Sequence, residues 1–348
     1  MNDHQQKKVI LTHHKTGDTK EFILRHFTCT DADKVIQCVR EEYDDTYYRR
    51  EFYDRELLLE LAESGELHLY LACCGDELCG IQSIISHSGE TRVEAASQIF
   101  RKKYRGYGLP YELVKYTYEL ASLLSPSCIY ASTVVFHNIT QSMCEDAGMV
   151  PSAFNLGSHI TSKMHNSYLL GESEKYAQAI LILPVGKKDA GTIYVSPEIL
   201  DTVKRIYSEM KVTVDIVSDP SGTEKDDDSF SSKLRIKANE REQSVSIYTD
   251  LIGSDFIKEV RNIKEKYAGK LWTLQLILPV DSPRAIGLYE ELKKEGFFFA
   301  GVRPLCSKKE EIFMQYTGDV RFVFDDFKLT ERFHRLLNDI RRLKGEIR

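Results

Sequence analysis

The sequence contains no apolar run that approaches the roughly 20 residues needed by a membrane-spanning helix. Its first residues, MNDHQQKKVILTHHKTGD, lack the apolar central segment of a secretory signal. These two absences favour a cytoplasmic protein that does not insert into membranes.

The eight cysteines are scattered, and no two of them form a C-x-x-C pair. Cys73, Cys74 and Cys79 are close in sequence, but LHLYLACC is typical of a strand, in which successive side chains point to opposite faces. Their spacing matches no established zinc site. We therefore expect reduced thiols and no bound metal.

Extreme charge is also missing: the 348 residues carry a formal net charge of −6. A weakly acidic chain argues against general binding to nucleic acid or membrane surfaces, although a local basic patch is compatible with it. With 42% hydrophobic residues, 19 Tyr and 16 Phe, the chain has the composition of a folded protein. Its length suggests two domains of ordinary size.

The hydrophobic pattern predicts an α/β protein with a mixed sheet. After a polar arm at 1–20, residues 21–27 form a predicted strand, followed by helices at 31–43 and 55–64. Further strands are predicted at 67–74, 78–87 and 91–100. A helix at 109–124, a strand at 128–136, a helix at 138–148 and a last strand follow.

The second half repeats this order imperfectly. The order of helix, strand, helix, glycine and strand around 254–302 is similar to that around 108–154, which indicates an internal duplication. We therefore predict two tandem copies of one fold. The predicted parts are an N-terminal arm at 1–20, a first domain at 21–172, a degenerate second copy at 173–328 and a C-terminal helix at 329–348.

The most unusual segment is RKKYRGYGLP at 101–110, which combines four cations with two glycines. It suits a phosphate-bearing ligand, a nucleic acid or a solvated surface turn. A glycine turn between a strand and a helix can direct backbone N–H groups and the helix dipole at an anion, and nearby cations can meet peripheral phosphates. The Walker pattern is absent, and the third glycine of a dinucleotide fingerprint is missing.

The segment YRGYGLPYELVKYTYELA resembles the acyl-CoA-binding motif of the GNAT family of N-acetyltransferases, [QR]-x-x-G-x-[GA]. Residues 105–110 occupy its six positions. FILRHFTCTDADKVIQCV is similar to the opening strand and helix of that family, and STVVFHNITQSMCEDAGM to its later strand, helix and glycine. The resemblance covers about 21–155 and implies the GNAT acyl-CoA N-acyltransferase fold.

The resemblance implies that the backbone amides of residues 105–109 hold the pyrophosphate of acetyl-CoA, and that its pantetheine arm pairs with the preceding strand. The cofactor-binding residues expected on this basis are Gln98, Ile99, Phe100, Lys103, Arg105, Gly106, Tyr107, Gly108, Leu109 and Asn138. Pro110 departs from the pattern and removes one N–H donor. The second copy has no R-x-x-G-x-G after its strand SVSIYTD, so we expect it to bind no coenzyme.

Transfer of an acetyl group to an amine requires a base that takes the amine proton and an acid that protonates the departing thiolate. Glu94 lies on the strand where the family often places its base; it could instead be an exposed glutamate paired with Arg92. The resemblance implies a tyrosine acid four residues before Gly148, but Cys144 stands there. Cys144 is either a substitute acid or a buried structural residue.

These residues lead to three hypotheses. The first is an N-acetyltransferase that uses acetyl-CoA and an amine acceptor, which is a small molecule or a protein. The second is a catalytically weak acyl-CoA sensor or adaptor on the same fold, suggested by the missing tyrosine and by Pro110. The third, aminoacyl-tRNA-dependent transfer, needs a broad positive surface, and the net charge argues against that.

Overall fold

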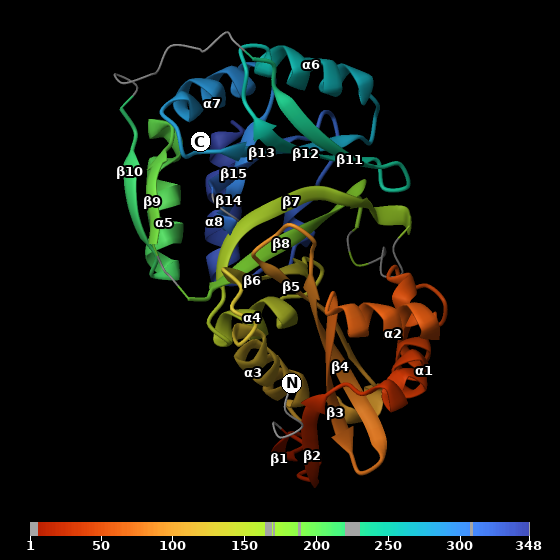
Figure 1. Ribbon diagram of the computed structural model, residues 1–348. Helices are drawn as coiled ribbons and strands as arrows, with labels where there is room; N and C mark the ends of the chain where they lie inside the picture. Colours follow the sequence, from red (N-terminus) through yellow and green to blue (C-terminus); the bar gives the residue numbers. More distant parts are fainter. Residues whose placement is uncertain are drawn as a thin grey trace. The chain divides into compact units, whose positions relative to one another are not determined.

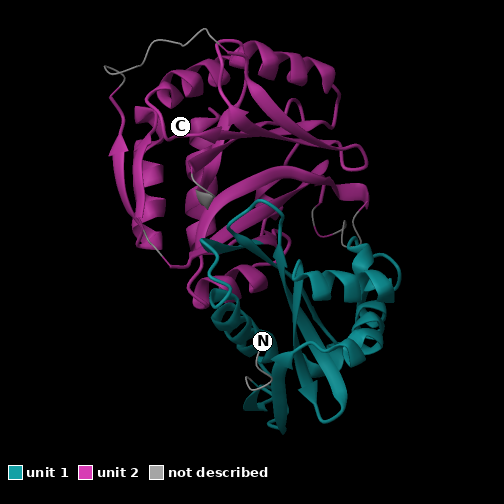
Figure 2. Ribbon diagram, in the orientation of Figure 1, with its two compact units in different colours: residues 1–131 teal, residues 132–348 magenta. Residues whose placement is uncertain are grey.

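A computed structural model describes residues 6–163, 169, 171–186, 189–219, 230–306 and 309–347. The chain divides into two compact units, 1–131 and 132–348 (Figure 2), and the division falls inside strand β6 (Cys128–Val134). No helix in the described ranges is both long and apolar enough to cross a membrane.

Unit 1 contains a sheet with the strand order β1-β2-β3-β4-β5-β6. Neighbouring strands are antiparallel except β5 and β6, which are parallel. The strands before β6 are β1 (Lys7–Thr12), β2 (Thr19–His26), β3 (Leu67–Cys74), β4 (Glu77–Ser86) and β5 (Val93–Phe100).

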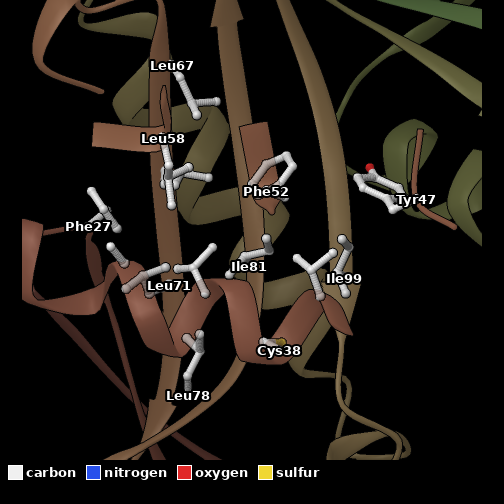
Figure 3. Packing of buried hydrophobic residues seen from close by; sticks show 14 of the residues in the cluster. Phe27, Cys38, Tyr47, Phe52, Leu58, Leu67, Leu71, Leu78, Ile81 and Ile99 are labelled. Atoms are coloured by element: carbon white, nitrogen blue, oxygen red, sulfur yellow. The ribbon is translucent and has the colours of Figure 1, made fainter. Parts of the chain in front are cut away.

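Helices cover both faces of this sheet (Figure 1): α1 (Ala32–Tyr43) and α2 (Arg55–Ser64) lie on one face and α3 (Leu109–Ser122) on the other. The alternation of side chains along β3 produces this arrangement. Leu67 and Leu71 enter the core under α1 and α2 (Figure 3), whereas Tyr70 contacts the ring of Tyr116 in α3. The three predicted helices are confirmed. Gly65 has φ of +78° and ends α2 as expected.

Strand β1 is an element that the sequence analysis does not predict. Residues 1–20 are expected to be a polar arm, yet Lys7–Thr12 pairs with Thr19–Leu24 in an antiparallel hairpin. The signal is weak because only Val9 and Leu11 turn an apolar side chain inward, and both are half-buried.

Unit 2 contains strands that pair in the order β8-β7-β14-β15-β13-β12-β11. These strands are β7 (Val150–Ile160), β8 (Lys175–Pro184), β11 (Lys233–Asn239), β12 (Ser244–Leu251), β13 (Thr273–Pro279), β14 (Phe298–Cys306) and β15 (Lys309–Tyr316). Two short strands, β9 (Asp189–Tyr194) and β10 (Thr213–Val217), form a separate parallel pair that was not predicted.

The helices of unit 2 are α4 (Ile139–Asp146), α5 (Leu200–Met210), α6 (Phe256–Lys266), α7 (Arg284–Lys294) and α8 (Glu331–Leu343). Helix α8 confirms the predicted C-terminal helix and packs against β7 and β14, with the rings of Phe154 and Phe333 5.3 Å apart. The side chain of Thr330 accepts a hydrogen bond from the N–H of Phe333 and caps its start.

The boundary between the compact units differs from the predicted division at 172/173. The reason is that β7 pairs with β14. Because β7 and β8 form a hairpin, both strands belong to unit 2 together with β14. Strands β7 and β14 meet closely at Gly301, where a Cβ atom would lie 2.3 Å from the Cα of Ala153. Only glycine allows the two backbones to approach so closely. The division of the chain into two copies of the fold, 21–172 and 173–328, stays a prediction.

The order of pairing does recur along the chain. An antiparallel pair leads into a parallel pair joined through a helix, both in β4, β5, α3 and β6 and in β11, β12, α6 and β13. Each series continues with a helix and a hairpin, α4 with β7 and β8, and α7 with β14 and β15.

One buried ion pair supports a stability test in unit 1. Both carboxylate oxygens of Asp31 accept hydrogen bonds from the guanidinium of Arg25 at 2.7 Å, and Thr28 donates its N–H and hydroxyl to one of them. Burial alone would raise the pKa of Asp31, but these hydrogen bonds outweigh it and lower the pKa to about 2.

Asp31→Asn should therefore reduce the free energy of unfolding at pH 7 by roughly 2 kcal/mol. Because folding lowers the pKa, this stabilisation is present above about pH 4 and is lost as the pH falls towards 2. Urea unfolding of both proteins between pH 7 and pH 2 measures it. A difference that stays constant over this range would contradict an electrostatic origin.

Candidate functional site

The site is centred on a bulge in β5. Ile81 pairs with Ile99 and Ser83 with Ala96, so β5 has one residue more than β4 between these pairs. Ser97 lies in the bulge with φ of +52°. The extra residue reverses the alternation, and for this reason Ala96 and Ile99 both contact the core under α1 and α2.

Strands β5 and β6 pair only over a short stretch. Their partners in unit 1 are Val93 with Ile129, Glu94 with Tyr130 and Ala95 with Ala131. β5 then continues to Phe100 and pairs there with β4; the Phe100 carbonyl also accepts a hydrogen bond from the Arg105 side chain at 3.4 Å. Within the described part of unit 1, no strand pairs with the other edge of Gln98–Phe100, the segment expected to meet the pantetheine arm.

The glycine turn follows directly. A short 3-10 turn at Lys102–Tyr104 leads to Gly106 with φ of +92° and Gly108 with φ of +73°, and α3 begins at Leu109. Both φ values lie in the left-handed region that favours glycine. Gly106, Tyr107, Gly108 and Leu109 donate their N–H groups to no acceptor in the residues that the structure describes, whereas Arg105 N–H is already bonded to the carbonyl of Lys102.

Three of the four cations of the turn, Arg101, Lys103 and Arg105, pair with carboxylates from distant parts of unit 1. Arg101 pairs with Glu41 and Glu77, each at 2.8 Å, and Lys103 with Glu77 at 2.5 Å. Hydrogen bonds from Lys103 and from the hydroxyl of Tyr104 lower the pKa of Glu77 to about 2, so this carboxylate stays charged at neutral pH.

Glu42 plays a similar part at Arg105. One of its oxygens accepts from the Arg105 guanidinium at 2.5 Å and the other from the N–H of Lys102 at 3.0 Å. Lys103 and Arg105 therefore have carboxylate partners that the sequence does not indicate, and their roles in binding phosphate stay predictions. The reason is long-range: the compensating glutamates lie far from the turn in sequence.

Glu94 has partners that the sequence analysis missed. It does not pair with Arg92, which bonds to Glu90 at 2.6 Å and lies over the ring of Tyr130. Instead, its carboxylate accepts from Arg49 at 3.1 Å and contacts His87 Nε2 at 3.2 Å. Burial would raise the pKa of Glu94, but the His87 and Arg49 contacts outweigh it and lower the pKa, which keeps the side chain ionised.

Two predicted site residues lie in unit 2. Asn138 is exposed at the start of α4, and Cys144 lies inside that helix with 2% of its surface exposed. Gln98–Phe100 and 103–109 lie together at the end of β5 and the start of α3 in unit 1. The binding and catalytic roles of all these residues stay predictions.

The turn between β1 and β2 also contacts the glycine turn, and sequence reasoning missed this contact. A Cβ atom at Gly106 would lie 2.4 Å from His13 Nε2, and the hydroxyl of Tyr107 donates to Asp18 at 2.6 Å. The only sequence signal is a turn-forming stretch, HHKTGD, between two short apolar runs.

The corresponding turn of unit 2, between β12 and α6, has a different structure. Arg284 donates to the carbonyls of Ile252 and Gly253 at 3.2 and 2.8 Å, and Gly253 N–H donates to Ser232 Oγ. Asp255, the residue before α6, places its own carboxylate there and accepts from Ser232 N–H. The expectation that the second copy binds no coenzyme stays a prediction.

Comparison with known proteins gives distant structural likenesses. No family model and no curated protein matches the chain. Solved structures similar to it include an acetyltransferase assigned to the GNAT family from Desulfovibrio desulfuricans (17% identity, 47% of this chain and 99% of that one, TM-score 0.37). Others are a ribosomal-protein-S5-alanine acetyltransferase from Vibrio fischeri (13%, 51% and 96%, 0.37) and an acetyltransferase from Bacillus subtilis in complex with CoA (17%, 47% and 98%, 0.35).

Because these likenesses are distant, the fold assignment rests on the topology. An opening strand with two helices, a glycine turn before α3, and a following strand and helix closed by Gly148 occur in the order that the sequence resemblance implies. The chain has the GNAT fold, built on a mixed α/β sheet.

The two glycines provide a matched pair for a stability test. Gly108→Ala should cost about 1 kcal/mol, since its φ is positive but a Cβ atom would meet nothing within 4 Å. Gly106→Ala should cost roughly 2–4 kcal/mol, because the added carbon also meets His13. Chemical denaturation measures both values.

A double-mutant cycle isolates the steric part. His13→Ala should recover stability in the Gly106→Ala background and none in the Gly108→Ala background. Equal costs for the two glycine variants would contradict the contact between the two turns.

Proposed function

We propose that the protein is an N-acetyltransferase that transfers the acetyl group of acetyl-CoA to an amine. The observation that carries this proposal is a set of four N–H groups, at residues 106–109, that have no acceptor among the described residues. They lie at the start of α3, beside an edge of β5 that no described strand of unit 1 covers. Such a turn suits a diphosphate, and such an edge suits an extended chain of amides.

Each part of acetyl-CoA has matching groups in this arrangement. The N–H groups of Gly106, Tyr107, Gly108 and Leu109 would hold the pyrophosphate, and the edge of Gln98–Phe100 would pair with pantetheine. The side chain of Arg105 is 58% exposed, so a phosphate could reach it by displacing Glu42. Lys103, paired with Glu77, and Asn138, exposed at α4, would contribute at the periphery.

Glu94 is the proposed base. Its lowered pKa keeps it ionised, so it can accept the proton of the acceptor ammonium while Arg49 and His87 hold the carboxylate in place. The amine nitrogen then forms a bond to the acetyl carbon as the C–S bond breaks. The nitrogen loses its second proton to solvent, and the thiolate takes a proton to become the free thiol. We propose Cys144 or solvent as the source of that proton.

The second hypothesis, an acyl-CoA sensor or adaptor, is favoured by one observation. The thiol that stands in place of the expected tyrosine acid belongs to a residue only 2% exposed. A sensor would bind acetyl-CoA through the same turn and would not need that acid. The neutralised cations of the turn give no support to tRNA-dependent transfer.

We also propose that residues 21–172 and 173–328 are tandem copies of the fold and that only the first binds acetyl-CoA. The recurring order of strand pairing supports the duplication. The closed turn at Gly253 supports the loss of binding in the second copy.

Coenzyme A binding provides the first test, with two variants of opposite expected effect. Arg105→Ala should weaken binding by about three- to ten-fold, because it removes one charge-assisted contact. Glu42→Gln should tighten binding, since it releases Arg105 from its carboxylate. Isothermal titration calorimetry measures both.

Arg40→Ala is the matched control, because Arg40 is an exposed cation of α1 whose ion-pair partner is Asp45. Its affinity should equal that of the wild type. Absence of coenzyme A binding by the wild-type protein would remove the proposal.

Glu94→Gln tests catalysis separately. The turnover number with a reactive amine should fall about 10²- to 10⁴-fold while affinity for acetyl-CoA is retained. Since the pKa of Glu94 is below its ordinary value of 4.5, its protonation should not limit the rate between pH 5 and pH 8. Steady-state kinetics over this range measure both effects, and unchanged turnover in the variant would favour the sensor.

A further inference from the structure

The β1–β2 turn holds one particular peptide group of the glycine turn. His14 donates its backbone N–H to the carbonyl oxygen of Gly106 at 3.0 Å, and its Nδ1 lies 2.8 Å from the same oxygen. A carbonyl has two lone pairs, and both are used here by a single residue. The direction of the Gly106 carbonyl is therefore set from outside the glycine turn.

The peptide plane links this carbonyl to a second group. The C=O of Gly106 and the N–H of Tyr107 belong to the same trans peptide, so they point in opposite directions. Fixing the carbonyl towards His14 directs the Tyr107 N–H away from the hairpin. Because Gly106, on one side of this peptide, is a glycine with positive φ and few steric limits, its backbone alone does little to fix the direction of the peptide.

The turn between β1 and β2 is stabilised by hydrogen bonds among its own residues. His13 N–H donates to the carbonyl of Asp18 at 2.8 Å, and Gly17 N–H donates to the carbonyl of His13 at 2.9 Å. His13 Nδ1 accepts from the N–H groups of Lys15 and Thr16. These bonds close the turn between β1 and β2 on itself.

The side chain of Tyr107 gives a second attachment. Its hydroxyl donates to Asp18 at 2.6 Å, and its ring meets those of His13 and Phe22 edge-on, with centroids 4.9 and 5.4 Å apart. The residue is 7% exposed. The Tyr107 N–H is thus fixed in two ways: through the Gly106 carbonyl that precedes it and through the Tyr107 side chain that follows it.

We propose that the turn His13–Asp18 is a positioning element of the diphosphate site: His14, through the Gly106 carbonyl, and Asp18, through the Tyr107 hydroxyl, aim the Tyr107 N–H at the diphosphate. This inference rests on the proposed function. It assigns a role in ligand binding to residues that lie about 90 positions before the glycine turn.

The test compares two probes, coenzyme A and pantetheine, which lacks the diphosphate. His14→Ala and, separately, Tyr107→Phe should weaken coenzyme A binding by about three- to ten-fold, the effect of one hydrogen bond. Both variants should leave pantetheine binding unchanged. Calorimetry measures the affinity for coenzyme A, and ligand-observed NMR measures the weaker affinity for pantetheine.

Lys8→Ala is the control within the hairpin, since Lys8 forms an exposed ion pair with Glu21 away from the turn. It should change neither affinity. A loss of affinity for both probes would show a general structural effect and overturn the inference, as would an unchanged affinity for coenzyme A. Tyr107→Phe keeps its ring packing, so it gives the answer if His14→Ala fails to fold. Absence of coenzyme A binding by the wild type would instead remove the proposed function itself.

Discussion

Four cations within five residues repel one another, and the structure of unit 1 around the glycine turn is arranged to offset that repulsion. Glu41 and Glu42 come from the last turn of α1, and Glu77 from the start of β4. The turn is therefore tied to both elements through charge. What it offers to a ligand is mainly backbone N–H groups, with little unpaired positive charge.

This balance constrains the kind of partner that the site suits. A polyanion such as nucleic acid is bound largely through unpaired cations, whereas a diphosphate can be held by a few fixed amides. The carboxylate of Glu42 already accepts hydrogen bonds from the Arg105 guanidinium and from the Lys102 N–H, as two oxygens of a phosphate would. The bulge in β5 completes the arrangement, because it lets Ile99 enter the core while the edge beyond Ala95 stays unpaired in unit 1.

The sequence allowed most of the architecture to be predicted, because it depends on local patterns. Apolar spacing defined α1 and α3, Gly65 marked the end of α2, and two glycines marked the positive φ values before α3. The short strands β1, β9 and β10 were missed, since a few half-buried residues give little periodic signal.

The site was predicted less completely because its contacts join distant residues. Glu94 was expected to pair with Arg92, two positions away on the same strand, but Arg49 and His87 reach it from the α1–α2 connection and from the end of β4. Likewise, nothing local in HHKTGD indicates that His14 bonds to Gly106. Pairings of this kind depend on the folded arrangement, which one sequence does not contain.

Strand β11, at the end of the strand order of unit 2, has a consequence for solubility. A terminal strand exposes unpaired backbone groups that another chain could extend into a shared sheet. Lys233, Arg235 and Lys237 alternate with smaller or apolar residues along it, and all three are exposed. If β11 of a second molecule approached this edge, it would bring its own Lys233 and Lys237 close to the same cations, which disfavours pairing of β11 with itself.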